Sequence, residues 1–182
     1  IAETPSSSAM RQICVSVISN GGYQRLDEDW TAARTTTVNV STSFYPLVAI
    51  RMASGRTDSV IIPSALSVLR IAQGNYQYAL IRNPDTITGG TWVTHTPSTG
   101  SVEYNISATA MTGGTIVLEG FIASSNQASS QINLGNGSVA RFDLQLGRTN
   151  ADTPVSDVYV LGIKSLGGTQ SAIGSISWFD LI

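Results

Sequence analysis

Charged residues are scarce in this chain. Only 12% of its 182 residues are Asp, Glu, Lys or Arg, against roughly 25% in an average domain. Hydrophobic residues make up an ordinary 42%, so Ser, Thr, Asn, Gln and 17 Gly supply the missing polarity. The net charge is −2, whereas nucleic-acid-binding domains normally carry a basic stripe. The composition argues against a nucleic-acid partner and predicts a surface of hydroxyls and amides, common in extracellular, fibrous and viral β-proteins.

Cysteine and histidine are nearly absent. Cys14 is the only cysteine, so no disulfide can form within the chain. His95, in THTP, is the only histidine, and no G-x-S-x-G motif is present, so we expect an exposed loop histidine rather than a catalytic base. One Cys and one His cannot complete a tetrahedral zinc site without several carboxylates. We therefore expect a protein that is not an enzyme, with no catalytic residue, no cofactor and no metal.

Two groups of acidic residues are the only candidates for a metal site in the sequence. Asp27, Glu28 and Asp29 could bind a hard cation such as calcium, and so could Asp152 with Asp157. Neither group has the spacing of an EF-hand. We expect both to be solvated acidic loops.

Long hydrophobic runs are also missing. None approaches the ~20 residues of a membrane-spanning helix, and no signal peptide is recognisable, so we expect no membrane partner. The first residue is Ile1 rather than Met, as expected where a preceding piece was removed or omitted. Residues 1–10, IAETPSSSAM, have large apolar side chains only at Ile1 and Met10. Such a segment cannot bury enough surface to order itself, so we expect an arm that is ordered by a neighbouring chain.

The clearest local pattern is SALSVLRIAQGNYQYALIR, residues 64–82. Two apolar, β-prone runs flank Gly74-Asn75, a pair typical of a two-residue hairpin turn. In that register Leu69 and Ile71 share a face with Tyr78 and Leu80. A slip by one residue would exchange the faces of the hairpin.

Short alternating segments separated by turn residues fill the rest of the chain. We expect strands at 11–19, 36–40, 47–53, 60–62, 91–94, 102–106, 115–123, 140–146, 155–164 and 173–181. The last two should form a hairpin around Gly167-Gly168, and Pro63 should separate residues 60–62 from the hairpin at 64–82. No segment has helical periodicity over ten residues. This pattern predicts an all-β, antiparallel β-sandwich of jelly-roll-like type, as a single domain over 11–182 after the arm 1–10.

The expected strand 140–146 has the cleanest alternation. Phe142 and Leu144 are separated and flanked by Arg141, Asp143 and Gln145. We therefore expect Phe142 and Leu144 to lie in the core.

Several aromatic residues lie in or beside expected loops. Tyr23 and Trp30 belong to the polar stretch YQRLDEDWTAARTT, and Trp92 follows Gly89-Gly90. Rings on loops can stack on sugars or anchor protein interfaces, although packing at the edge of the core is the common alternative. The candidate interface or ligand contacts are Ile1, Met10, Tyr23, Trp30 and Trp92.

Three segments, RQICVSVISNGGYQ, RIAQGNYQYALIRNP and SISWFDLI, carry a family resemblance. With a first strand running into a GGY turn, a mid-chain L-I-R-N-P strand and a C-terminal strand holding a Trp, the chain resembles β-sandwich domains of tailed-bacteriophage virion proteins. Such domains occur in head-decoration, fibre and baseplate-associated proteins. The resemblance spans most of residues 11–182 and implies a jelly-roll-like, usually trimeric module of the virion without catalysis.

Three hypotheses follow for function. The first is a non-enzymatic virion structural protein, a capsid-decorating or appendage module that assembles as a homo-oligomer, with a trimer favoured, and contacts virion proteins such as the major capsid protein. The alternative is a carbohydrate- or receptor-binding module of a phage tail fibre, with Trp30, Trp92 or Tyr23 as the stacking platform. The third is an enzyme such as a glycan depolymerase.

Overall fold

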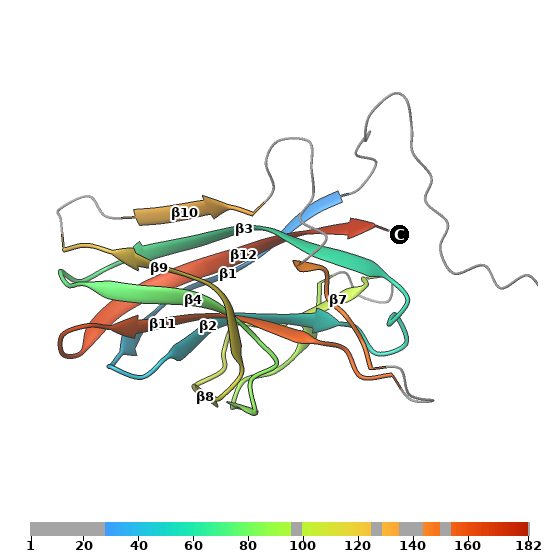
Figure 1. Ribbon diagram of the computed structural model, residues 1–182, viewed down its shortest axis with the longest axis horizontal. Coiled ribbons are helices and arrows are strands. Elements are labelled where there is room, and N and C mark those ends of the chain that lie inside the picture. Colours follow the sequence, from blue (N-terminus) through green and yellow to red (C-terminus); the bar gives the residue numbers. More distant parts are fainter. Residues whose placement is uncertain (1–27, 96–99, 125–128, 135–143, 150–153, 182) are drawn as a thin grey trace, which may run out of the picture.

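The computed structural model describes residues 28–95, 100–124, 129–134, 144–149 and 154–181 (Figure 1). It is 63% strand, with no helix in the described part. The long strands are β1 (Glu28–Val40), β2 (Tyr45–Met52), β3 (Val60–Arg70), β4 (Tyr76–Arg82), β9 (Thr115–Ile122), β10 (Ser129–Asn133), β11 (Val158–Ser165) and β12 (Gln170–Leu181). Four short strands, β5 (Thr86–Thr88), β6 (Val93–Thr94), β7 (Val102–Asn105) and β8 (Ala110–Thr112), lie between β4 and β9. The expected all-β fold is confirmed.

The strands form two packed layers, seen one above the other in Figure 1. Sheet A has the order β1-β12-β3-β10 and sheet B the order β6-β7-β2-β11-β4-β9, while β5 and β8 make a separate pair. The long strands pair in a nested way: β1 with β12, β2 with β11, β3 with β10 and β4 with β9, all antiparallel. This nested pairing, divided between two sheets, is the double Greek key of a jelly roll.

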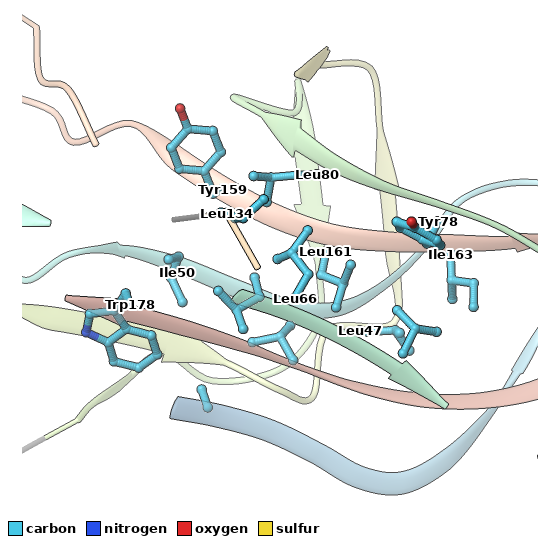
Figure 2. Packing of buried hydrophobic residues seen from close by; sticks show 14 of the residues in the cluster. Leu47, Ile50, Leu66, Tyr78, Leu80, Leu134, Tyr159, Leu161, Ile163 and Trp178 are labelled. Carbon is cyan, nitrogen blue, oxygen red and sulfur yellow. The ribbon is translucent and has the colours of Figure 1, made fainter. Parts of the chain in front are cut away.

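The core lies between the two sheets (Figure 2). On β11 the alternate residues Tyr159, Leu161 and Ile163 are completely or almost completely buried, in one hydrophobic cluster with Leu66 and Trp178 from sheet A. Alternation of this kind follows from the two-residue period of a strand. Full burial of one such side chain stabilises the fold by about 1.5–3 kcal/mol, so this interior is the main source of stability.

The expected hairpin at residues 64–82 is wrong. Its two halves are β3 and β4, which belong to different sheets: β3 pairs with β12 and β10, and β4 with β11 and β9. The segment between them crosses from one layer to the other. The hydroxyl of Tyr76 anchors this crossing by donating to the carbonyls of Ala72 and Ser171, at 3.1 and 3.0 Å.

The predicted faces of β3 are wrong for the same reason. Leu69 and Ile71 were expected to share a face with Tyr78 and Leu80, but Tyr78 and Leu80 are buried whereas Leu69 is 43% exposed and Ile71 is 52% exposed. Ile61, Leu66 and Val68 are the residues of β3 in the core cluster. Two strands facing each other across a sandwich show the same alternation as two strands side by side, so the pattern alone did not separate these arrangements.

The predicted C-terminal hairpin fails in the same way, because β11 lies in sheet B and β12 in sheet A. Pro63 does not end a strand either: β3 runs through it, with a register shift against β12 between Ser177 and Trp178. Residues 28–35, expected in an exposed loop, are the first half of β1. In the expected strand 140–146, Leu144 and Leu146 are buried but lie outside any strand. Phe142 and the expected strand 11–19 lie outside the described residues.

The connection between β4 and β9 covers part of the outer side of sheet B. Ala79 and Val160 are completely buried although they alternate with the core residues of their strands. Met111 of β8 reaches this surface, since its terminal methyl would lie 3.1 Å from a Cβ placed on Gly162. Arg34 ties the same connection to sheet A by donating to the carbonyl of Ala108 at 2.8 Å. Part of the outer face of sheet B is therefore shielded from solvent.

Candidate functional site

The predicted contact residues are not brought together. Ile1, Met10 and Tyr23 lie outside the described residues. Trp30 lies in β1 and packs against the core, whereas Trp92 lies just before β6. Trp30 and Trp92 therefore do not form one contact surface.

The β6–β7 pair separates them, because adjacent residues of a strand point to opposite faces. In β7, Tyr104 is paired with Ile50 of β2 and packs against the core. The preceding residue, Glu103, is paired with Arg51 of β2 and points to the outer side. This edge of the sandwich therefore has an inner aromatic cluster and an outer charged cluster.

The inner cluster, here the His95 cluster, contains Trp30, His95, Tyr104 and Trp178. The imidazole of His95 lies 4.3 Å from the indole of Trp30 and 5.3 Å from that of Trp178, between ring centroids. The ring of Tyr104 is farther away, at 6.1 Å. His95 is half-buried, so the expected exposed loop histidine is wrong. Burial lowers the pKa of His95, and the charge of Asp180 opposes that shift.

The outer cluster, here the Arg51 cluster, contains Arg51, Trp92 and Glu103. Nε of Arg51 donates to Oε2 of Glu103 at 2.8 Å, and Nη2 lies 2.7 Å from the same oxygen in an ion pair. The guanidinium carbon also lies 4.2 Å from the centroid of the Trp92 ring. A cation over an indole adds about 0.5–1 kcal/mol at an exposed site. Arg51 is therefore held in one position by a carboxylate and a ring.

A cavity of about 300 Å³ adjoins the Arg51 cluster. Arg51 and Glu103 form part of its wall, with the hydroxyl residues Ser54, Thr57 and Ser156 and the apolar residues Met52, Pro154, Val155 and Val158. The Ser156 hydroxyl is engaged, since it accepts from the amide of Met52 at 2.9 Å and donates to the carbonyl of Asp157 at 2.7 Å. The cavity thus combines one positive group, one negative group and an apolar surface.

Of the Arg51 cluster only Trp92 was predicted; Arg51, Glu103 and the cavity were not. One signal was present, because Arg51 is the single charged residue in the apolar strand β2. A charge in such a strand needs a partner, but the identity of that partner, Glu103, depends on the pairing of β2 with β7.

The outer face of sheet A is a second surface. We use this name for the side chains of three cross-strand rows: Thr31–Ser177–Ala65, Ala33–Ser175–Ser67 and Ile173–Leu69. All are exposed or half-buried, and none of these described residues is charged. Thr31 and Ser177 share a hydrogen bond of 2.8 Å between their hydroxyls. Leu69 and the neighbouring Ile71 give one end of this face an apolar character.

The acidic residues considered for calcium are only partly described. Asp157 accepts from Nη2 of Arg82, from Nδ2 of Asn83 and from the amide of Gly147. Asp29 accepts from the Ser64 hydroxyl, while Asp27 and Asp152 are outside the described residues. Where the chain is described, no group of three His, Cys, Asp or Glu side chains is placed to hold a metal ion. That part of the chain also contains no helix long and apolar enough to span a membrane.

Comparison with known proteins adds no relative. No protein-family model matches the chain, and no curated protein matches its sequence significantly. The resemblance to phage virion domains therefore stays a hypothesis, and function has to be argued from the fold and its surfaces.

Proposed function

We propose that this protein is a non-enzymatic structural protein of a bacteriophage virion, a capsid-decorating or appendage module that assembles with copies of itself and with other virion proteins. The observation that carries the proposal is a jelly roll whose sheet A presents, on its outer face, three cross-strand rows without a charged side chain. Jelly rolls are frequent in viral capsid proteins but also occur in lectins and cupins. Since a fold does not determine function, the surface has to supply the remaining support.

The outer face of sheet A is suited to contact with an identical copy. Two copies of a face without charge do not repel each other, and Ser and Thr hydroxyls both donate and accept hydrogen bonds. The exposed Leu69 and Ile71 would be removed from water by such a contact. A homo-oligomer is therefore favoured, with the trimer suggested by the family resemblance.

The charged side chains give this proposal further support, because several act between strands. Arg82 pairs with Asp157, Arg51 pairs with Glu103, and Arg34 donates to two backbone carbonyls. A glycosidase needs two carboxylates that face a substrate, whereas Asp157 and Glu103 are each paired with an arginine of a neighbouring strand. Assembly, in contrast, requires only a stable and complementary surface.

Purified virions test the location. The experiment is mass spectrometry of purified particles of the phage whose genome encodes this chain. We expect it to find the protein at a constant copy number relative to the major capsid protein. Absence from purified particles would contradict the proposal.

Light scattering on the isolated protein tests self-assembly through sheet A. We expect the wild-type chain to be an oligomer and Ser175→Glu, at the centre of the outer face of sheet A, to lower its mass to that of a monomer. Thr42→Glu introduces the same charge at an exposed loop position and is expected to leave the mass unchanged. A monomeric wild-type protein, or a folded Ser175→Glu variant of unchanged mass, would overturn assembly through this face.

A further inference from the structure

The cavity beside the Arg51 cluster is not needed for assembly through sheet A, because its walls come from β2, β7, β11 and the loops near them. Its charged pair is held rigidly, with Trp92 on the guanidinium and Glu103 on its Nε and Nη2. These contacts use one oxygen of Glu103. Among the residues that the structure describes, Nη1 of Arg51 and Oε1 of Glu103 have no hydrogen-bond partner.

The sign of the charges restricts the ligand. An anion would gain from Arg51 but would be repelled by Glu103, and a cation would meet the reverse situation. A neutral ligand that offers donors and acceptors close together can use both groups. Hydroxyls of Ser54 and Thr57 add further polar positions on the wall.

The apolar part of the wall restricts the ligand further. Met52, Pro154 and Val155 line the same cavity as the polar groups and can contact a C–H surface. A volume of about 300 Å³ is at the lower end of the range for small-molecule sites, roughly 300–1,000 Å³. A single sugar ring has this combination of size, C–H face and hydroxyl edge.

We propose that this cavity binds a saccharide. One hydroxyl of the ring accepts from Nη1 of Arg51, and a neighbouring hydroxyl donates to Oε1 of Glu103. The C–H face of the ring packs against Val155 and Pro154. Trp92 acts as a positioning residue, because its ring holds the guanidinium and does not line the cavity. This inference goes beyond the proposed assembly function and does not depend on it.

Titration of the full chain with sugars tests the proposal. The probes are D-glucose, D-galactose, D-mannose and N-acetyl-D-glucosamine, each added to isotope-labelled protein and followed by two-dimensional NMR. We expect at least one sugar to give saturable shifts at the backbone amides of Arg51, Glu103 and Ser156. Binding through a few hydrogen bonds predicts a dissociation constant on the order of millimolar.

Three variants locate the binding. Glu103→Gln keeps the shape of the side chain but replaces a charged acceptor with a neutral one, and Arg51→Ala removes the charged donor, so we expect each to weaken binding by about 10-fold or more. Lys164→Ala is the matched control, since it removes a cation that lies over an aromatic ring, that of Phe44 at 4.7 Å, and that is not part of the cavity wall. We expect the control to keep the wild-type affinity. The dispersion of the NMR spectrum shows whether each variant is folded.

Two results would overturn the saccharide site. One is a lack of saturable shifts at the cavity with all four sugars. The other is binding that a folded Glu103→Gln variant leaves unchanged, or that Lys164→Ala weakens equally. The assembly proposal is tested by particle composition and oligomer mass, so a protein that binds no sugar would leave it standing. Conversely, a protein that is monomeric and absent from virions would leave the saccharide site standing.

Discussion

Trp30 and Trp178 are directly opposed partners on β1 and β12, and the imidazole of His95 lies against both of their rings. The two tryptophans belong to sheet A, whereas His95 follows β6 at the edge of sheet B. The three rings therefore connect the two layers at this edge. Because one of them is titratable, the connection should respond to pH.

Acidification should weaken the fold through His95. Burial lowers the pKa of His95 in the folded protein below its ordinary value of about 6.5, so the unfolded chain binds the proton first as pH falls. The stabilisation is complete above about pH 6.5 and is lost as pH falls through the folded-state pKa. We expect the urea midpoint of the wild-type protein to decrease between about pH 7.5 and pH 5.5, where ordinary carboxylates remain ionised.

His95→Phe is the control for this pH dependence. It retains an aromatic ring against Trp30 and Trp178 but has no titrating group. We expect its urea midpoint to change less than that of the wild-type protein over the same pH range. Equal pH dependence in the two proteins would show that other groups cause the effect.

A second prediction concerns the close approach of the sheets at Gly174. A Cβ at this position would lie 2.8 Å from Cδ1 of Leu47 and 2.8 Å from the carbonyl oxygen of Ser67. Since the backbone of Ser67 cannot move without disturbing β3, Gly174→Ala should cost about 1–3 kcal/mol, as overpacking usually does. Gly167→Ala, where a Cβ would meet nothing within 4 Å, should change the free energy of unfolding by less than about 0.5 kcal/mol.

Equal effects of the two glycine substitutions in denaturant titrations would mean that the sheets are not tightly packed at Gly174.

The alternation of apolar residues predicted where strands lie in the sequence better than it predicted which strands are neighbours in a sheet. β2, β7 and β9 were expected close to their observed bounds, because apolar runs between turn residues mark strands directly. In contrast, β3 and β4 were expected side by side but face each other across the core. A period of two specifies which side chains are buried and says nothing of which strand they meet.

The candidate site was less predictable for a related reason. The Arg51 cluster joins residues of β2, of β7 and of the segment before β6, so its members meet only after the sheet has formed. Trp92 was expected as a contact residue because it follows two glycines. The pair of Arg51 and Glu103 could not be predicted, because it depends on the register of β2 against β7. His95 was misjudged because a short loop sequence contains no information on the two strands of sheet A that enclose it.

A third prediction concerns Leu144, which the alternation of residues 140–146 placed in the core. It is 4% exposed, so Leu144→Ala should destabilise the protein by about 2–5 kcal/mol. Leu166, which is 50% exposed, provides the control, and Leu166→Ala should cost less than about 1 kcal/mol. A loss below about 0.5 kcal/mol for Leu144→Ala in urea titrations would contradict its place in the interior.

The last prediction concerns Asp157, which joins three segments of the chain. Its carboxylate accepts from Nη2 of Arg82 at 2.6 Å, from Nδ2 of Asn83 at 2.6 Å and from the amide of Gly147 at 3.0 Å. Asn83 in turn accepts from the amide of Val158 at 2.8 Å and has a left-handed backbone, with φ of 49°. Asn is among the few residues that adopt this conformation at low cost.

Asp157→Ala should therefore leave three donors without their acceptor at the end of β4 and the start of β11. We expect a loss of about 2–3 kcal/mol in the free energy of unfolding, since hydrogen bonds to a charged group contribute more than neutral ones. Asp58→Ala removes an acid of the same type at an exposed position and should stay within about 0.5 kcal/mol of the wild type. Amide hydrogen exchange gives the sharper measurement, because Val158 and Gly147 should lose protection in Asp157→Ala while Leu161 at the centre of β11 keeps it. Uniform loss of protection along β11 would show that Asp157 supports the whole sheet rather than this junction.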